Sequence, residues 1–396
     1  MWFDSASSSL AVLGHDPTLP FPADIYFEGG DQYRGWFHSS LLVAVGLHDR
    51  APYREVATNG WALDGQGHAM HKSLGNVIEP QTIIKSHGAE ILRLWTASQD
   101  FTEDVRISKE MLERLSDSYR KIRNTFRYLL SNLFDFDPAK DQVPAGEMLE
   151  VDQWAMQQLA RLTELCRKHY EEYAFHKVYH AIYHFCTVEM SAFYLDITKD
   201  RLYTAGAASP ARRSAQTAMY RIADALMRLV APIMCFTADE VWRHMPSAQG
   251  KPADSETVHF AQFPQPGEYT AGLSQEHLVR LANWDKLIAV RDEVLKKLEV
   301  ARREKFIGQS LEARLELTVA GETAALLEQY RAMLPMLFIA SQVTLNAVHG
   351  LPATAVADIA EGIPELAIRV HKADGTKCER CWNYSTQVGA DNTLPT

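Results

Sequence analysis

The sequence predicts three structural parts in order: half of a doubly wound α/β sheet, an α-helical bundle and a small α+β module. Three successive patterns of apolar and polar residues along the chain support this prediction. Short apolar runs ending at glycines come first, apolar residues at steps of three and four follow, and alternation of apolar and polar residues begins after Gly308. At about 150 residues per domain, a chain of 396 residues is long enough for such a division.

The first part reads as strand, helix, strand. Residues 24–27 and 56–58 are strand-length apolar runs followed by glycine turns, and residues 36–45 between them have a helical pattern. This order indicates parallel strands whose following loops carry the functional site. Because at most two or three strands can be counted, we expect half of a domain and not a complete sheet.

The second part has helical periodicity. Residues 109–134 bury one apolar stripe, and five further stretches show the same pattern: 152–169, 178–199, 211–230, 232–244 and 285–306. Asp152 is an expected N-cap, and Pro232 an expected helix start. We therefore predict a bundle of five or six helices.

Two of these helices carry basic residues on the faces predicted to point outward. The two sets are Arg114, Lys121, Arg123 and Arg127, and Arg291, Lys296, Arg302 and Arg303. Such faces can bind RNA phosphates. The alternative is that they are solvated helix faces whose positive charge is balanced by nearby acidic residues. The net charge of −10 means that any nucleic acid must meet a local basic surface.

In the third part, the apolar residues recur at every second position. Apolar residues alternate along 311–319, a helix is predicted over 322–336, and strands are predicted over 342–348 and 366–371. This pattern indicates a small α+β module.

Composition narrows the class of protein. Hydrophobic residues make up 46% and charged residues 23%, which disfavours disordered and coiled-coil classes. No apolar run is long enough for a membrane span and no signal peptide is recognisable, so a cytoplasmic protein without membrane contact is expected. The five cysteines are odd in number and do not form a disulfide pattern.

Two glycine-containing segments are candidate sites. Residues 28–37 combine Glu28, Gly29, Asp31 and Gln32 at a strand-to-helix junction, where a ligand can approach the backbone; a simple glycine turn is an equal alternative. Residues 64–76 form a glycine-rich loop with Lys72, whose charge can stabilise phosphate oxygens; taken alone, a hairpin with a solvated lysine is the simpler interpretation.

Two further patterns concern metals. His176, His180 and His184 share one helix face, but no glutamate follows the first histidine, so packing is favoured over a metal site. Cys378 and Cys381 have the spacing of one arm of a zinc site, and no second pair follows them. We therefore expect half of a Zn²⁺ site.

Together the motifs resemble bacterial isoleucyl-tRNA synthetases, a family of class I aminoacyl-tRNA synthetases. The resemblance covers nearly the whole chain. It is carried by the segments 2–5 (WFDS), 28–37 (EGGDQYRGWF), 69–76 (AMHKSLGN), 104–108 (DVRIS), 119–126 (YRKIRNTF) and 378–382 (CERCW). The leucine and valine enzymes differ over residues 28–37, which makes the amino-acid assignment fairly specific.

The resemblance implies a division into four domains. They are the C-terminal half of a Rossmann-type catalytic domain (1–107), a helical anticodon-binding domain (108–306), a small α+β junction domain (307–371) and a partial zinc-binding module (372–396). It also implies that the protein is a monomer when complete.

The resemblance further implies roles for single residues. Glu28, Gly29, Asp31 and Gln32 would contact the aminoacyl-adenylate, and Trp2 and Trp36 would wall the isoleucine side chain. Lys72 matches the second lysine of the family's Lys-Met-Ser-Lys-Ser signature, so it would be the catalytic and ATP-binding lysine. Cys378 and Cys381 would bind zinc.

The implied reaction is ligation of L-isoleucine to tRNA(Ile), with ATP and Mg²⁺ forming isoleucyl-adenylate. Ala69, His71 and Asn59 depart from the family's lysine, serine and histidine. The family's His-Ile-Gly-His motif and editing domain are missing, so we expect a C-terminal portion that is inactive alone. The alternative is a non-catalytic tRNA-binding or interaction protein derived from a synthetase.

Overall fold

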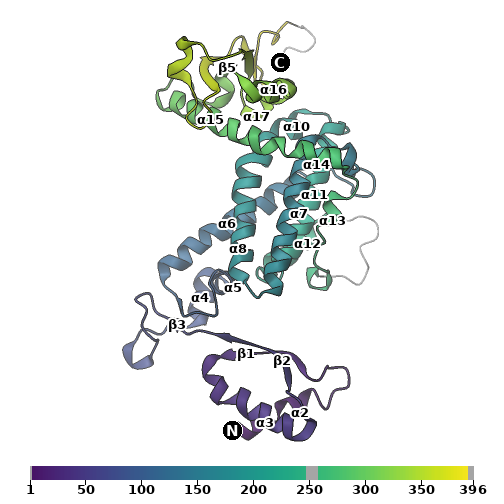
Figure 1. Ribbon diagram of the computed structural model, residues 1–396, viewed down its shortest axis with the longest axis vertical. Helices are drawn as coiled ribbons and strands as arrows, with labels where there is room; N and C mark the ends of the chain where they lie inside the picture. Colours follow the sequence, from purple (N-terminus) through teal and green to yellow (C-terminus); the bar gives the residue numbers. More distant parts are fainter. Residues whose placement is uncertain (1, 247–256, 391–396) are drawn as a thin grey trace. The chain divides into compact units, whose positions relative to one another are not determined.

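The computed structural model describes residues 2–246 and 257–390 (Figure 1). The chain divides into two compact units. The first unit comprises Met1–Arg120, Lys168–Ala181 and Pro232–Phe236, and the second comprises Lys121–Arg167, Ile182–Ala231 and Thr237–Thr396.

A two-stranded parallel sheet lies in the first unit, as the order of strand, helix and strand predicts. Its elements are β1 (Ala23–Gly29), α3 (Trp36–His48) and β2 (Tyr53–Asn59). The buried ring of Tyr26 on β1 stacks on Trp36 of α3 at a centroid distance of 4.4 Å, and its hydroxyl lies 3.0 Å from Ser40 Oγ. This aromatic contact fixes the helix against the first strand.

A second small parallel sheet follows in the same unit. Here β3 (Ala62–Leu63) pairs with β4 (Val105–Arg106), and α4 (Pro80–His87) and α5 (Ala89–Ala97) lie between them in the sequence. Gly60 connects β2 to β3 and donates its N–H to the Phe101 carbonyl at 2.9 Å. A Cβ at Gly60 would lie 2.3 Å from the backbone of Glu103, so only glycine fits this crossing.

The helices expected from the 3.6-residue period are present. The long ones are α6 (Lys109–Ser131), α7 (Glu150–Glu171), α8 (Phe175–His184), α11 (Pro210–Val230), α12 (Cys235–His244) and α15 (Asn283–Arg303). The structure also contains short helices, most of them outside the predicted stretches: α1 (Trp2–Ala6), α2 (Ser8–Val12), α9 (Leu195–Ile197), α10 (Lys199–Thr204), α13 (Gly267–Thr270) and α14 (Gln275–Leu281). The side chains of Ile122, Phe126 and Leu129 on α6 are fully buried, which confirms its apolar stripe.

Pro232 does not start a helix, and that expectation was wrong. α12 begins at Cys235 instead. The carbonyl groups of Pro232 and Ile233 accept hydrogen bonds from the Arg93 guanidinium at 2.7 and 3.0 Å. A contact distant in sequence therefore overrides the local preference of proline for the first helical turn.

The stretch 178–199 is not one continuous α-helix. π-helical turns occupy Phe185–Tyr194 between α8 and α9. Because π-helical turns hold more residues than α-helical turns, they change which side chains face the neighbouring helices. Tyr194, the last residue of this segment, is completely buried.

A buried polar cluster joins four segments of the second unit, which are α7, the π-helical turns, α10 and α11. The carboxylate of Asp152 on α7 accepts hydrogen bonds from the Tyr194 hydroxyl at 2.7 Å, from the Arg201 guanidinium at 2.7 and 2.9 Å and from the Ser214 hydroxyl. α7 begins at Glu150, so Asp152 lies inside the first turn and the expectation of an N-cap was wrong. A charge with no exposure requires such partners, and these partners hold Asp152 inside the bundle.

The α+β module also belongs to the second unit. Its three-stranded sheet has the order β6-β5-β7, formed by β5 (Ala313–Val319), β6 (Gln342–Ala347) and β7 (Leu366–Lys372). Alternate residues of β5 are buried, which confirms the period of two. The predicted helix over 322–336 is divided into α16 (Gly321–Gln329) and α17 (Leu334–Phe338).

Two further observations concern the helices and the cysteines. Among the residues described, no helix combines the length and the apolar character that crossing a membrane demands. Cys166, Cys186, Cys235, Cys378 and Cys381 are all free thiols, in agreement with the lack of a disulfide pattern. Burial raises the pKa of both the Cys166 and Cys186 thiols to about 12, so these two residues act as core side chains.

We expect Asp152→Asn to destabilise the protein strongly. The substitution leaves the buried Arg201 guanidinium without its charged partner, which typically lowers the free energy of unfolding by about 3–5 kcal/mol. Asp117→Asn is the matched control, because it removes an exposed ion pair to Arg120 that is worth at most about 1 kcal/mol. Urea denaturation followed by circular dichroism measures both, and equal midpoints for the two variants would contradict this role of Asp152.

Candidate functional site

The carboxyl ends of β1 and β2 lie side by side. Glu28 is paired with Thr58 and Gly29 with Asn59 in the parallel register. The segment after β1 and the segment after β2 therefore leave the sheet at the same edge, where ligands of parallel α/β sheets bind.

The turn after β1 brings most of the residues of the first predicted site together. A short 3₁₀ helix over Gly30–Arg34 follows β1. Gln32 Nε2 donates to Asp31 Oδ2 at 3.0 Å, and Gln32 Oε1 accepts the Trp36 N–H at 3.1 Å, so Gln32 links the turn to α3. A Cβ at Gly29 would lie 2.7 Å from Asp31 Oδ1, so any larger residue here would displace the Asp31 carboxylate from its present position.

The two tryptophans flank the same turn. The Trp2 ring lies about 3 Å from the position that a Cβ of Gly35 would occupy, and Trp36 follows Gly35 directly. The Trp36 indole N–H donates to the Ser5 carbonyl at 2.9 Å and its ring stacks on Tyr26. Trp36 is thus held firmly, whereas about half of the Trp2 side chain is exposed.

The loop after β3 carries the lysine and consists of two successive turns. The first turn is closed by hydrogen bonds from Asp64 N to His68 O at 2.9 Å and from Gly67 N to Asp64 O at 3.0 Å. The second is a 3₁₀ turn over Lys72–Leu74 that ends at Gly75, whose φ is +65°. Lys72 is exposed on this second turn, where its ammonium group is accessible to an anionic ligand.

The three departures from the family pattern lie on the lysine loop and at the end of β2. Ala69 and His71 are exposed on the lysine loop. Asn59 donates to the Gly60 carbonyl at 2.9 Å and lines an open cavity of about 330 Å³. The same cavity contains the aromatic side chains of Phe27, Trp61, Trp95 and Phe101, which the sequence did not single out because aromatic residues are common in any core.

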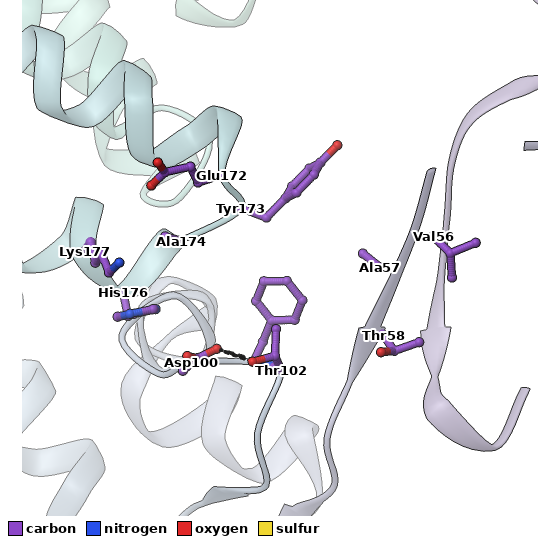
Figure 2. A pocket seen from close by; sticks show the side chains of 11 residues that line it. Val56, Ala57, Thr58, Asp100, Thr102, Glu172, Tyr173, Ala174, His176 and Lys177 are labelled. Carbon is purple, nitrogen blue, oxygen red and sulfur yellow. Dashed lines mark hydrogen bonds between the residues drawn. The ribbon is translucent and has the colours of Figure 1, made fainter. Parts of the chain in front are cut away.

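A second cavity of the first unit, of about 470 Å³, lies on β2 (Figure 2). Val56, Ala57 and Thr58 line one wall. The turn before α8 and the residues His176 and Lys177 in the first turn of α8 line another. A hydrogen bond from Thr102 lowers the pKa of Asp100, and the charges of His176 and Lys177 act in the same direction. The cavity thus mixes acidic and basic groups and favours no single ligand charge.

The three histidines do not form a metal site within the residues that the structure describes, where no group of three or more His, Cys, Asp or Glu is placed to hold an ion. His176 lies at the cavity on β2, the His180 ring contacts Tyr179, and His184 lies 3.6 Å from Glu189. Packing and surface contacts account for His180 and His184, whereas the buried Nδ1 atom of His176 has no hydrogen-bond partner in the described part of the chain.

The two C-terminal cysteines occupy the tip of a hairpin between β8 (Thr376–Lys377) and β9 (Tyr384–Ser385). Backbone N–H groups of Cys381 and Arg380 lower the pKa of the Cys378 thiol, which favours the thiolate that zinc requires. The imidazole of His371 on β7 contacts Glu316 at 3.0 Å and is not placed with the two thiols. The described residues thus provide two donors suited to Zn²⁺, half of a tetrahedral set.

The basic face of α6 is exposed as predicted. Arg114, Lys121, Arg123 and Arg127 are all exposed, and the Lys121 ammonium group donates to the Tyr183 hydroxyl at 2.9 Å. Arg123 and Arg127 line an open cavity of about 350 Å³ with Phe126 and His244, and Glu240 lies 3.4 Å from Arg123. This surface combines cations with an apolar floor.

The face of α15 differs from the expectation. Arg291 is only 4% exposed because its Nε donates to the Leu337 carbonyl at 2.9 Å and its guanidinium pairs with Asp196 at 3.2 Å. Lys296 and Arg302 pair with Glu293 and Glu299 of the same helix. The expected outward position of Arg291 was therefore wrong, and α6 is the stronger candidate for RNA contact.

Comparison with known proteins identifies two family regions. Residues 1–108 match the family model "tRNA synthetases class I (I, L, M and V)", and residues 152–317 match "Anticodon-binding domain of tRNA ligase". The LeuRS of Agrobacterium radiobacter K84, solved in a ternary complex with tRNA and LeuAMS, has a similar fold, with a TM-score of 0.54 and 20% identity over 67% of this chain and 32% of that one.

Curated relatives extend the similarity over nearly the whole chain. The isoleucine–tRNA ligase of Syntrophotalea carbinolica is 51% identical over 98% of this chain, and that of Geobacter sulfurreducens is 50% identical over 100%. The chain spans about 40% of the length of these relatives. By its sequence and its two matched regions, the chain belongs to the isoleucine–tRNA ligase family of class I tRNA synthetases.

Proposed function

We propose that the chain is the C-terminal portion of an isoleucine–tRNA ligase, which activates L-isoleucine with ATP and Mg²⁺ and transfers it to tRNA(Ile). The observation that carries this proposal is the parallel pairing of β1 with β2, because it brings the acidic glycine turn to the same edge as the end of β2, from which the chain continues through β3 to the lysine loop. The family membership of the chain supports the same reaction.

In this proposal the turn after β1 binds isoleucyl-adenylate. Glu28 and Asp31 are exposed carboxylates that can accept hydrogen bonds from an ammonium group or a ribose hydroxyl. Gly29 lacks a side chain and lets the ligand approach the backbone, and Gln32 is already oriented by its bonds to Asp31 and Trp36. All four residues act as binding groups.

Trp2 and Trp36 form the isoleucine pocket. Their flat apolar rings flank Gly35 and suit a branched aliphatic side chain. Such walls distinguish isoleucine from valine by only about 1–3 kcal/mol, because the two amino acids differ by one methylene group.

Lys72 is the catalytic and ATP-binding lysine of the proposal. Its ammonium group stabilises the negative charge that develops on the leaving pyrophosphate when the isoleucine carboxylate attacks the α-phosphate. Lys72 contacts the ATP phosphates from one side only. In this proposal, the groups that bind ATP from the opposite side come from residues outside this chain. The chain alone is therefore inactive in this account.

The remaining parts bind tRNA and support the fold. We assign residues 1–107 to the catalytic half-domain, 108–306 to anticodon binding, 307–371 to a junction domain and 372–396 to a partial zinc module. The last of these extends over residues 391–396, which lie outside the described part of the chain. A cytoplasmic monomer, when complete, agrees with the proposed role in protein synthesis.

A second candidate function is a non-catalytic tRNA-binding or interaction protein derived from a synthetase. The observation in its favour is that Ala69, His71 and Asn59 replace residues of the family pattern beside the site. Against it, Lys72 and the whole Glu28 to Gln32 turn have the side chains that activation requires. The two functions differ in whether isoleucine-dependent chemistry can be restored.

We expect isoleucine-dependent pyrophosphate exchange to appear when this chain is mixed with the remaining, N-terminal part of the Syntrophotalea carbinolica relative, and not with either part alone. Lys72→Ala should then lower the rate about 100- to 1,000-fold, the usual effect of losing one donor to a developing negative charge. Lys85→Ala, which removes an exposed lysine of α4, should leave the rate unchanged. Equal rates for the two variants would exclude the proposed role of Lys72.

Binding of tRNA(Ile) to this chain should depend steeply on salt through the α6 face. Each phosphate contact releases about one counterion, so Arg123→Glu with Arg127→Glu should weaken binding and flatten the plot of log affinity against log salt by about one to two units. Lys140→Glu with Arg331→Glu is the charge-matched control away from α6. Filter binding at several salt concentrations measures both slopes, and an unchanged slope in the α6 variant would contradict RNA contact by this face.

The chain should bind Zn²⁺ weakly and below one equivalent, because two thiolates do not complete a tetrahedral site. Cys378→Ser and Cys381→Ser should abolish this binding, whereas Cys235→Ser should not. Zinc content after dialysis, measured by atomic emission, checks the expectation. One tightly held equivalent that survives a strong chelator would show that the half-site interpretation is wrong.

A further inference from the structure

The second turn of the lysine loop is held mainly by one side chain, that of Asn76. The carboxamide oxygen of Asn76 accepts the His71 N–H at 2.9 Å, and its Nδ2 group donates to the Ala69 carbonyl at 3.1 Å. The same Nδ2 group also donates to Asp64 Oδ2 at 2.9 Å. Asn76 therefore closes the turn that carries Lys72 and connects it to the first turn.

Asp64 is the centre of the first turn. Its Oδ1 atom accepts the N–H groups of Gln66 and His68 at 3.0 and 2.9 Å, while Oδ2 accepts Asn76. These hydrogen bonds, that from Asn76 above all, lower the pKa of Asp64. The carboxylate is therefore ionised at neutral pH, and its hydrogen bonds are of the stronger, charge-assisted kind.

The first turn is itself anchored to regular structure. Leu63 of β3 accepts the N–H of Ile107, a buried residue directly after β4, at 3.0 Å. A Cβ at Gly65 would lie 3.1 Å from Ser108 Cβ, and one at Gly67 would lie 3.1 Å from the Arg106 guanidinium. The turn thus lies directly on the chain that leaves β4.

We propose that Asp64 and Asn76 are positioning residues for Lys72, with the pair acting as a clasp (Asp64–Asn76) between the anchored first turn and the lysine-bearing second turn. This inference rests on the proposed function of Lys72. The backbone bonds of the second turn, from Leu74 N to His71 O and from Gly75 N to Lys72 O, lie within the turn and do not tie it to the sheet. An antiparallel bridge between Leu63 of β3 and Ala69 holds the chain that enters the turn, and the clasp joins the turn itself to Asp64. The lysine thus reaches the pyrophosphate from a preorganised backbone.

The clasp should affect the chemical step more than substrate binding. Lys72 stabilises charge that develops only in the transition state, so a displaced lysine lowers kcat and leaves KM for isoleucine and ATP nearly unchanged. Misplacement of a catalytic group by about 1 Å can reduce the rate about 100-fold. We therefore expect Asn76→Ala to lower the exchange rate of the two-part enzyme about 10- to 100-fold.

The test is a double-mutant cycle in the enzyme assembled from this chain and the N-terminal part of the relative. Asn76→Ala, Lys72→Ala and the double variant are compared by kcat and KM for pyrophosphate exchange. If Asn76 acts through Lys72, Asn76→Ala should reduce kcat less than twofold in the Lys72→Ala background. The control is Gln66→Ala, which keeps the backbone N–H bonded to Asp64 and should leave the rate unchanged.

Hydrogen exchange of the chain alone supplies a readout that does not depend on activity. Asn76→Ala should speed exchange of the His71 amide, whose acceptor it removes, while amides of β1 and β2 remain protected. Asp64→Asn, which weakens the clasp but keeps its shape, is a second variant if Asn76→Ala folds poorly. Like Asn76→Ala, Asp64→Asn should lower kcat.

The outcomes separate this inference from the proposed function. Two results would overturn the positioning role alone, provided that exchange still depends on Lys72. In the first, Asn76→Ala leaves the exchange rate unchanged. In the second, Asn76→Ala lowers the rate by the same factor whether residue 72 is lysine or alanine. Exchange that does not depend on Lys72 in the otherwise unaltered enzyme would overturn the proposed function. A slow His71 amide in Asn76→Ala would show that the clasp does not hold the turn.

Discussion

The parallel pairing of β1 with β2 is the constraint on which the candidate site depends. The two strands share one register from Ala23 and Tyr53 to Gly29 and Asn59, so the segments that follow them emerge at one edge. The stacked rings of Tyr26 and Trp36 then hold α3, and with it the glycine turn, against β1. A shift of one residue in this register would turn the site-bearing side chains to the opposite face.

Side chains, more than backbone ladders, determine the shape of the segments beyond the strand ends. Gln32 links its turn to α3, and the Asp64–Asn76 clasp links the lysine turn to β3. In the second unit, Asp152 plays a comparable part by joining the bundle segments through Tyr194 and Arg201. Buried or half-buried polar groups of this kind stabilise one arrangement because every alternative leaves a donor or acceptor unpaired.

Local periodicity predicted the elements well, and tertiary contacts explain the errors. The apolar stripe of α6 and the alternation of β5 appear in the structure as the sequence indicated. The N-cap role of Asp152 and the outward position of Arg291 were wrong because partners far away in sequence bind both side chains. In the candidate site the sequence pointed to Lys72, but Asn76 was missed; the only local signal was an asparagine directly after Gly75.

The central claim is that the edge formed by β1 and β2 binds isoleucyl-adenylate. Titration of the isotope-labelled chain with a non-hydrolysable isoleucyl-adenylate mimic, followed by amide NMR, tests this claim most directly. The account predicts saturable shifts at the amides of Glu28 to Gln32 and around Lys72, and weaker shifts with the leucyl mimic. Absence of shifts at both segments, or shifts confined to another surface, would contradict it.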